Sequence, residues 1–434
     1  MGISRRELFK AAAAGAVIGS VAKFNFTFAK VSETIKLPKP KRGAPRVVIV
    51  GGGWSGSTLA KYIKKLKPDV DVVLIEKREH FWSCPVSNLW LVGLVDLEFL
   101  LHDHRPAAEK YGYHLLRATA YHIDRVGRYV YTDLGKIHYD FLVLATGIDY
   151  DYSQWVGDDP KDVEIAKTKY PAAFVPGGEQ ITLKKKIENF EEGNFVITVP
   201  PGLDYRCLPG PYERATLIAW YFKQNEIPGK VILIDPHPQP PVKAEGFHKA
   251  WEEYVKDYLE YYPNATIKGV DFGKKVVSTE EYGDIDFTDL NLYPRCKATK
   301  LIFDADLVPK GDRWPSLRWP YNISTKDSHI LCTGDARNHP FSKSGNTANT
   351  EAHKVAKQII ELIKGRMPDY EAPRTLCYSA VDKGKAVWVD LTYKYDPKKN
   401  TFQFWNVKMD NHPTHQNWRA YIEWARAMYR DMFS

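Results

Sequence analysis

A glycine-rich turn near the start of this 434-residue chain constrains its fold more than any other feature. The β-branched run 46–50 leads directly into Gly51, Gly53 and Gly56, which have the spacing G-x-G-x-x-G. Apolar residues at helical spacing follow the turn, and a second short β-branched run ends in Glu76. A strand, a glycine turn of this spacing, a helix and a second strand ending in an acid together predict a βαβ unit that binds a dinucleotide.

Each of these residues has a separate physical task. Gly51 allows the tight turn, Gly53 lets the backbone approach a pyrophosphate, and Gly56 permits close packing of the helix on the strand. The free N–H groups at the start of the helix favour the negative charge of the phosphates. We expect Glu76 to accept hydrogen bonds from the ribose hydroxyls of the adenosine.

Two later segments indicate that the dinucleotide is FAD. One apolar strand ends in Ala145, Thr146 and Gly147, and a second, at 330–336, carries Asp335 after a Thr-Gly pair. Both segments resemble the flavin fingerprints of the flavoprotein superfamily that has two dinucleotide-binding domains. This resemblance implies that Asp335 lies beside the ribityl chain of the flavin.

The middle of the chain predicts a second strand–helix–strand unit that lacks a phosphate-binding turn. The strand 194–199 is followed by Pro200 and Pro201, and proline has no N–H to offer a phosphate. The next strand, 230–234, ends in Asp235, so the doubly wound pattern is retained. We therefore expect a second Rossmann-like domain without a nucleotide site, and an electron donor other than NAD(P)H.

Cys207 lies just ahead of a predicted helix with proline in its first turn. The positive end of the helix dipole and the charge of Arg206 would both favour the Cys207 thiolate. Glu213 lies in the first turn of the same helix, where it could move protons. It could equally serve only to complement the helix dipole, and the sequence leaves both interpretations open.

The N-terminus has the pattern of an export signal. Arg5 and Arg6 precede a mild apolar run at 11–22, and small residues near position 29 offer a cleavage site. The pattern resembles a twin-arginine signal, whose pathway exports folded proteins, and it predicts a periplasmic protein that receives its cofactor before export. Beyond residue 30 no apolar run is long enough to span a membrane, so we expect no transmembrane segment in the mature chain.

Charge and cysteine spacing narrow the range of partners. The formal net charge is +8, of which 1–29 contributes +3, and the remaining mild basic balance could help to dock an acidic protein. No basic stripe or recognition motif accompanies the charge, so we expect no nucleic acid partner. The sequence has neither metal-ligand spacing nor a C-x-x-C-H motif, so electrons must leave to a separate cytochrome c or to quinone.

Four further stretches resemble the flavoprotein subunit of flavocytochrome c sulfide dehydrogenase, a relative of sulfide:quinone oxidoreductase. These stretches are 207–215, 177–180, 334–335 with Lys343, Ser344 and Gly345, and 377–379. The resemblance implies that Lys343 and Ser344 lie at the cofactor. It also implies that Cys84 binds FAD covalently, as a thioether at the flavin 8α position, and that Cys207 and Cys377 form a redox-active disulfide. A structural disulfide closing a loop of about 170 residues, with about 4–5 kcal/mol of stabilisation, is the alternative.

The resemblance covers about residues 44–434 and implies an α/β fold. The implied fold comprises two Rossmann-like dinucleotide-binding domains, the second without a nucleotide site, and a C-terminal α+β domain. The expected segments are a signal peptide at 1–29, an FAD-binding domain in two parts at 44–160 and 296–370, the second Rossmann-like domain at 161–295, and a C-terminal interface domain at 371–434.

The function expected from the residues and the resemblance is that of a periplasmic sulfide dehydrogenase subunit. Sulfide would open the Cys207–Cys377 disulfide, and the electrons would pass to the flavin and then to a c-type cytochrome. A membrane-associated sulfide:quinone oxidoreductase is one alternative, because the aromatic stripe at 417–433 could lie on a membrane. Packing on the protein's own core or on a partner is the commoner use of such a stripe. A flavoprotein that maintains a sulfur carrier by thiol exchange is the other alternative.

Overall fold

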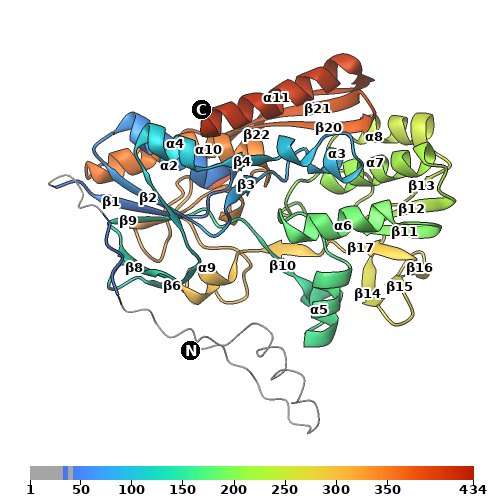
Figure 1. Cartoon of the computed structure of the whole chain (residues 1–434), viewed down its shortest axis with the longest axis horizontal. Coiled ribbons are helices and arrows are strands. Elements are labelled where there is room, and N and C mark those ends of the chain that lie inside the picture. Colours follow the sequence, from blue (N-terminus) through green and yellow to red (C-terminus); the bar gives the residue numbers. More distant parts are fainter. Residues whose placement is uncertain (1–32, 38–42) are drawn as a thin grey trace, which may run out of the picture.

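The computed structural model describes residues 33–37 and 43–434. The expected export signal at 1–29 lies outside the described residues. Two α/β domains lie side by side, and a C-terminal layer of three strands and one helix runs along both of them (Figure 1). The expected α/β architecture, with two Rossmann-like domains and a C-terminal α+β domain, is confirmed.

The first domain is built on a five-stranded parallel sheet of order β19-β9-β1-β2-β5. Its strands are β1 (Arg46–Val50), β2 (Asp71–Glu76), β5 (His114–Arg117), β9 (Phe141–Leu144) and β19 (Ile330–Cys332). One face is covered by α2 (Trp54–Leu66), α4 (Arg105–Tyr111) and α10 (Gly345–Ile363), and the other by the small sheet β6 (Ala120–Asp124), β7 (Tyr129–Thr132) and β8 (Gly135–His138).

The apolar run of β1 follows from its position inside this sandwich. Val47 and Ile49 belong to the core beneath α2 and α10, whereas Val48 and Val50 belong to the core shared with β6–β8. Successive side chains of a strand point to opposite faces, so a strand covered on both faces is apolar at every position.

The second domain has a parallel sheet of order β13-β12-β11-β17, and α7 connects β11 to β12. Its main elements are β11 (Gly193–Thr198), β12 (Gly229–Ile234), β13 (Leu259–Tyr262), β17 (Asp289–Asn291), α6 (Gly178–Glu188), α7 (Gly210–Gln224) and α8 (Ala244–Ala250). Shorter elements of the chain are β3 (His80–Trp82), α3 (Ser87–Leu91), β4 (Leu101–Asp103), α5 (Pro160–Lys169), β14 (Ile267–Asp271), β15 (Val276–Thr279), β16 (Asp284–Asp286) and α9 (Lys300–Asp304).

The chain crosses between the two domains twice, and the two crossings lie against each other. The outgoing segment β10 (Asp149–Asp151) pairs antiparallel with the returning segment β18 (Arg295–Lys297). The return leads to β19, which completes the first sheet beside β9. The first domain is therefore discontinuous in sequence, and both linkers are tied together where the domains meet.

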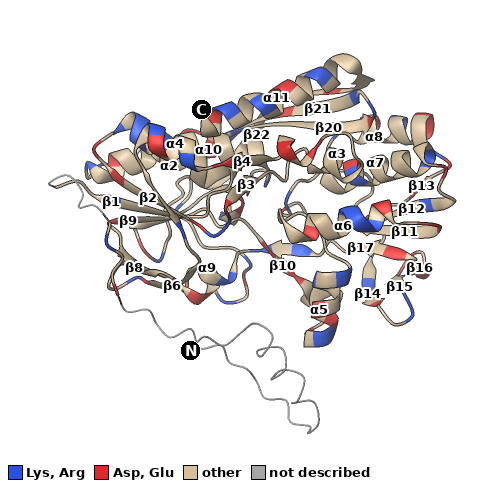
Figure 2. Cartoon of the chain, in the orientation of Figure 1, with Lys and Arg blue, Asp and Glu red and all other residues tan. Residues whose placement is uncertain are grey.

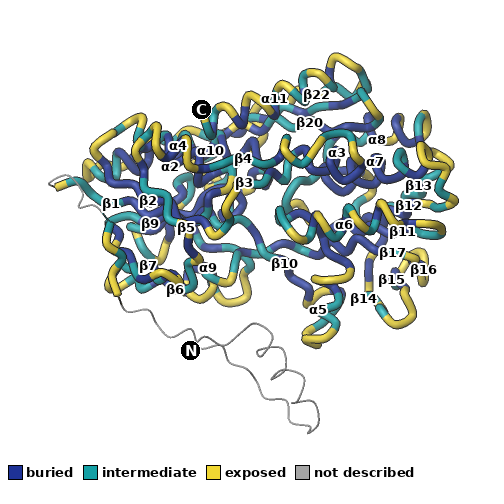
Figure 3. Tube along the Cα trace, in the orientation of Figure 1, coloured by how far each residue is buried: buried dark blue, intermediate teal, exposed yellow. Residues whose placement is uncertain are grey.

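The C-terminal layer consists of an antiparallel sheet and a helix. Its elements are β20 (Arg374–Asp382), β21 (Lys385–Asp396), β22 (Thr401–Thr414) and α11 (His415–Phe433). The apolar stripe of α11 faces inward, and Tyr421, Ala425 and Met432 are buried against the protein, which agrees with the alternation of buried and exposed positions along this helix in Figure 3. The stripe therefore packs on the protein's own core.

The outer surfaces carry charges of both signs. Figure 2 shows Lys and Arg interspersed with Asp and Glu along α11. None of the helices in the described part of the chain combines the length and the hydropathy that crossing a membrane requires.

Candidate active site

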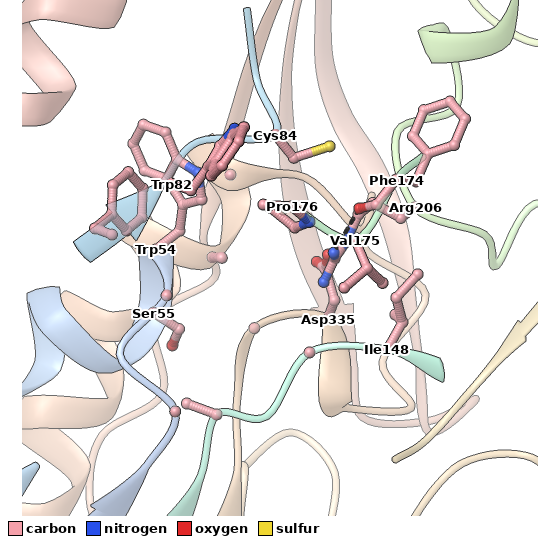
Figure 4. A pocket seen from close by; sticks show the side chains of 18 of the residues that line it. Trp54, Ser55, Trp82, Cys84, Ile148, Phe174, Val175, Pro176, Arg206 and Asp335 are labelled. Atoms are coloured by element: carbon pink, nitrogen blue, oxygen red, sulfur yellow. Dashed lines mark hydrogen bonds and ion pairs between the residues drawn. The ribbon is translucent and has the colours of Figure 1, made fainter. Parts of the chain in front are cut away.

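A cavity of about 490 Å³ lies where the two domains and the C-terminal layer meet. It extends from the glycine turn after β1 to the loop before α7 and to strand β20. Figure 4 shows Trp54 from the first domain on one side of its centre and Phe174 and Arg206 from the second domain on the other, with the sulfur of Cys84 pointing toward Phe174 and Arg206. The cavity thus collects residues from distant parts of the sequence.

The glycine turn has the geometry that its spacing predicts. Gly51 has a φ of +105°, and a Cβ there would lie 2.4 Å from the carbonyl oxygen of Ala145. A Cβ at Gly56 would lie 1.8 Å from the carbonyl oxygen of Gly51, so only glycine lets α2 pack this closely. A Cβ at Gly53 would meet no atom of residues 33–37 and 43–434 within 4 Å, and the open space in front of it is where a pyrophosphate can approach.

Glu76 lies at the end of β2, in the wall of the same cavity. Its Oε2 accepts a 2.6 Å hydrogen bond from the backbone N–H of Gly52, and its Oε1 accepts one of 2.8 Å from the N–H of Arg78. These bonds hold the carboxylate beside the glycine turn. A carboxylate has further acceptor positions, so Glu76 can also receive ribose hydroxyls.

The second half of the dinucleotide groove is formed by the ends of β9 and β19. Ala145, Thr146, Gly147 and Asp335 all line the cavity. Oδ2 of Asp335 accepts a 2.6 Å hydrogen bond from Nε of Arg206. Its Oδ1 is buried and has no hydrogen-bond partner in the described part of the chain. A buried acceptor without a partner is costly, and a hydroxyl group of a bound ligand would satisfy it.

These observations fit FAD. The glycine turn and the start of α2 would hold the pyrophosphate, Glu76 the ribose, and the orphaned Oδ1 of Asp335 a ribityl hydroxyl. Ser344 also lines the cavity, and its hydroxyl caps α10 by accepting a hydrogen bond from the N–H of Thr347. The start of α10 therefore faces the same space, where its N–H groups favour negative charge.

Lys343 is not among the residues that line the cavity, in contrast to the expectation from the sequence. Its ammonium donates hydrogen bonds to the carbonyl oxygens of Asp335 at 2.9 Å and of Arg337 at 2.7 Å, and it lies 3.6 Å from the ring centre of Trp314. Burial, together with the charge of Arg337, lowers the pKa of Lys343 to about 7. Lys343 thus stabilises the turn after β19 that contains Asp335.

Three cysteines line the cavity: Cys84, Cys207 and Cys377. Cys207 has a φ of +61°, a left-handed conformation that is uncommon outside glycine and that clusters at functional sites. Cys377 lies on β20, opposite Val389 of β21. The structure describes all five cysteines as free thiols, so the convergence of Cys207 and Cys377 is observed, whereas their disulfide and the thioether at Cys84 stay predictions.

The acidity of the Cys207 thiol differs from the sequence-based expectation. Burial raises the pKa of Cys207 well above its ordinary value, and the neighbouring Cys377, Cys84 and Glu213 raise it further. Arg206 does not offset this effect, because its guanidinium is bound to Asp335 and to the carbonyl oxygen of Phe174. The prediction of a favoured thiolate at Cys207 was therefore wrong, since a sequence does not show how deeply a loop is buried.

Glu213 lies at the centre of the thiol end of the cavity. Its carboxylate accepts hydrogen bonds from Asn88 Nδ2 at 2.9 Å, from the N–H of Ala380 at 2.8 Å and from the hydroxyl of Tyr421 at 3.3 Å. Burial raises the pKa of Glu213, and these hydrogen bonds partly oppose the shift. A buried carboxyl with a raised pKa beside two thiols can hold or release a proton, so the surroundings of Glu213 suit proton transfer.

Lys243 does not line the cavity itself, but it contacts one of the thiols that do, and sequence reasoning missed it. It precedes α8, it is 1% exposed, and its Nζ lies 3.7 Å from Sγ of Cys377 and 2.7 Å from the hydroxyl of Ser379. His104, which is also buried, lines the opposite end of the cavity near Gly52. Neither residue stands in a motif, and only its placement reveals it.

In the second domain, the acid at the end of β12 is engaged by protein side chains. Asp235, at the end of β12, is fully buried, and its Oδ2 accepts hydrogen bonds from the hydroxyls of Tyr212 at 2.8 Å and of Tyr261 at 2.7 Å. The Oδ1 atom of Asp235 is in hydrogen-bond contact with Nδ1 of His237, at 2.7 Å. The acid that would otherwise receive a ribose is thus already satisfied by protein side chains.

Three family models match the sequence. Residues 180–294 match "Sulfide dehydrogenase [flavocytochrome c] flavoprotein chain, central", and residues 372–433 match "Flavocytochrome c sulphide dehydrogenase, flavin-binding". Residues 45–168 match "Pyridine nucleotide-disulphide oxidoreductase".

Individual relatives give a consistent result. The chain is 50% identical over 46 residues to the sulfide dehydrogenase flavoprotein chain of Chlorobaculum thiosulfatiphilum. This alignment covers 11% of this chain and 96% of that sequence. It is 27% identical over 191 residues to the sulfide-quinone reductase of Aquifex aeolicus, an alignment that spans 43% of this chain and 42% of that relative. The solved sulfide:quinone oxidoreductase of Aquifex aeolicus superposes with a TM-score of 0.71 at 17% identity, over 90% of this chain and 92% of that chain. At this identity the superposition shows a shared fold.

Proposed function

Because the chain belongs to the flavoproteins related to flavocytochrome c sulfide dehydrogenase and sulfide:quinone oxidoreductase, we propose that it oxidises sulfide with FAD bound in the cavity. The observation that carries the proposal is the convergence of Cys207 and Cys377 on the wall of the cavity that also contains the dinucleotide-binding turn. The proteins named as relatives include a sulfide dehydrogenase flavoprotein chain and a sulfide-quinone reductase, which supports sulfide as the substrate.

The proposed reaction begins at the sulfur atoms. Hydrosulfide attacks the disulfide of Cys207 and Cys377, which leaves a persulfide on one cysteine and a thiolate on the other. FAD held in this cavity supplies an acceptor for two electrons that can pass them on singly. Glu213, with its raised pKa, holds or gives up a proton as the charge on the two sulfurs changes.

Cys84 is proposed to bind the flavin covalently. It lines the cavity between the glycine turn and the Cys207 loop, with its sulfur pointing to the open centre in Figure 4. A thioether would keep the cofactor bound after export. Export in the folded state through the twin-arginine signal at 1–29, and a periplasmic location, belong to the same proposal.

A c-type cytochrome is the proposed electron acceptor. The family models that match the central and C-terminal segments are those of a flavocytochrome c, which supports a haem-containing partner. The apolar stripe of α11 packs inside the protein, where Tyr421, Ala425 and Met432 are buried. Because this stripe is already covered, it does not support docking on a membrane.

Rapid mixing with sulfide tests this function. The flavin absorbance of the purified protein is expected to bleach on mixing and to return when oxidised cytochrome c is added. Recovery only with a quinone in detergent would select a sulfide:quinone oxidoreductase. Tight binding of a sulfur-carrier protein without bleaching by sulfide would select the thiol-exchange role, and absence of bleaching alone contradicts the proposal.

A further inference from the structure

We infer that Lys243 is a catalytic residue that makes Cys377 the leaving thiolate and thereby directs sulfide to attack Cys207. The inference rests on the proposed function in two respects, the disulfide between Cys207 and Cys377 and the identity of the nucleophile. It concerns which of the two sulfurs carries the negative charge when the disulfide opens.

Lys243 is held against Cys377 by its backbone and by Ser379. The residue has a φ of +61° directly before α8, and its side chain extends under β20 as a fully enclosed ammonium group. The hydrogen-bond partners of its Nζ are the hydroxyl of Ser379 at 2.7 Å, the carbonyl oxygen of Cys377 at 3.5 Å and the sulfur of Cys377 at 3.7 Å. None of these hydrogen-bond partners is a carboxylate. The charge of Lys243 acts on the nearby Glu213 carboxyl through space, and on the sulfur of Cys377 by direct contact.

The two sulfurs therefore lie in unequal surroundings. The charged or titratable groups that face Cys377 are Lys243 ahead of α8, Glu213 on α7, Cys207 in the preceding loop and Tyr421 on α11. Burial raises the pKa of Cys377, but Lys243 opposes this shift through both its charge and its hydrogen bond.

Among the described residues, no cation makes a comparable contact with Cys207. Burial raises the pKa of Cys207 well above its ordinary value, and Cys377, Cys84 and Glu213 add to the shift. Lys243 opposes it through its charge, but less than any of these groups raises it. Of the two thiols, Cys377 is the one whose anion is stabilised by a direct contact. A disulfide breaks preferentially toward the more stable thiolate, because the better leaving group departs faster.

The first step is balanced without any further reactant. HS⁻ attacks Sγ of Cys207 and forms an S–S bond, the bond between Cys207 and Cys377 breaks, and its electron pair stays on Sγ of Cys377. The incoming sulfur is oxidised to the sulfane level, the former disulfide is reduced, and one negative charge moves from hydrosulfide to Cys377. The persulfide therefore resides on Cys207, and the Cys377 thiolate is paired with the Lys243 ammonium.

Site-resolved alkylation of the reduced, FAD-containing protein tests the charge assignment without sulfide. Iodoacetamide is applied over a range of pH, and mass spectrometry quantifies the rate at each cysteine. We expect Cys377 to react at lower pH than Cys207. In Lys243→Met the rate at Cys377 near pH 8 should fall about tenfold or more, because a cation at this distance shifts a pKa by one unit or more.

The control variant is Lys385→Met. It removes the same charge from β21, outside the cavity, and should leave the pH dependence of alkylation at both cysteines unchanged.

The position of the persulfide gives a second readout. Oxidised protein is mixed anaerobically with one equivalent of sulfide, quenched with iodoacetamide and mapped by mass spectrometry. The expected product has the persulfide on Cys207 in the wild type and on both cysteines in Lys243→Met. The inference is overturned if the two cysteines of the wild type react equally or in the reverse order, or if the persulfide of the wild type lies on Cys377. Both outcomes are measured on the wild type, so neither depends on whether a variant folds. If the alkylation order holds but sulfide forms no persulfide, the proposed function fails and the role of Lys243 in thiol acidity stands.

Discussion

The backbone N–H of Cys207 donates a 2.7 Å hydrogen bond to the carbonyl oxygen of Lys343. This bond joins the thiol-bearing loop of the second domain to the segment that leads into α10 of the first domain. Arg206 adds a second connection through its ion pair with Asp335. The position of the Cys207 sulfur is therefore set by the domain that forms the dinucleotide groove, although the residue belongs to the other domain in sequence.

Replacing Cys207 by Ser should abolish the reaction with sulfide while leaving FAD bound. The rate of sulfide-dependent flavin bleaching should fall about a thousandfold or more, because the variant has no disulfide for sulfide to open. Stopped-flow absorbance measures the rate, and the visible spectrum reports cofactor content. Cys332→Ala, a buried thiol that does not line the cavity, serves as the control and should bleach normally. Unimpaired bleaching of Cys207→Ser would rule out the disulfide relay.

Denaturation should not release the flavin if Cys84 carries it. Acid-precipitated wild-type protein should give a yellow pellet, and a tryptic peptide containing Cys84 should carry the mass of the flavin. In Cys84→Ala the colour should appear in the supernatant. A colourless wild-type pellet shows instead that Cys84 only packs beside the cofactor.

Two glycines of the same turn should respond differently to alanine. Gly56→Ala places a Cβ 1.8 Å from the carbonyl oxygen of Gly51 and should destabilise the fold by about 1–3 kcal/mol or more. Gly53→Ala has open space around the added methyl group and should leave the stability of the cofactor-free protein nearly unchanged, while it weakens FAD binding. Urea unfolding of the apoproteins and FAD retention in the purified proteins distinguish the two effects. Equal loss of apoprotein stability in both variants would contradict the assigned roles.

Lys343 should make the protein more stable as the pH rises above neutrality. Its pKa is about 7 in the folded protein, where burial disfavours the charged form, and it lies near 10.5 for an ordinary lysine. Between these values the unfolded chain binds more protons than the native protein, so the free energy of unfolding rises with pH, by at most about 1.4 kcal/mol per pH unit from this group. Below pH 7 both states are protonated, and the contribution no longer changes.

The measurement is urea unfolding of wild type and Lys343→Met at pH 6, 7, 8 and 9. The difference in unfolding free energy between the two proteins should move in favour of the wild type with each step above pH 7. A difference that is independent of pH would show that Lys343 titrates normally in the folded state.

The dinucleotide groove could be anticipated from sequence because its determinants are local. Gly51, Gly53, Gly56 and Glu76 lie within one strand–turn–helix–strand unit, and periodicity specifies where each element begins and ends. The prediction that the second domain has no nucleotide site rests on equally local grounds, since Pro200 and Pro201 offer no N–H to a phosphate wherever the loop lies. The pairing of cysteines, by contrast, was expected only from family resemblance.

The acidities of the thiols depended on contacts between segments that are remote in sequence. Arg206 was expected to activate Cys207, but the return of the chain through β19 brings Asp335 within 2.6 Å and engages that charge. Lys243 stands in no motif, and it reaches Cys377 only because β20 folds back over the start of α8. Sequence by itself determined which elements bind a dinucleotide, because helix and strand periods and turn geometry are properties of neighbouring residues. Only the tertiary structure decided which charge faces which sulfur, because burial and Coulomb interactions depend on distances that chain connectivity does not specify.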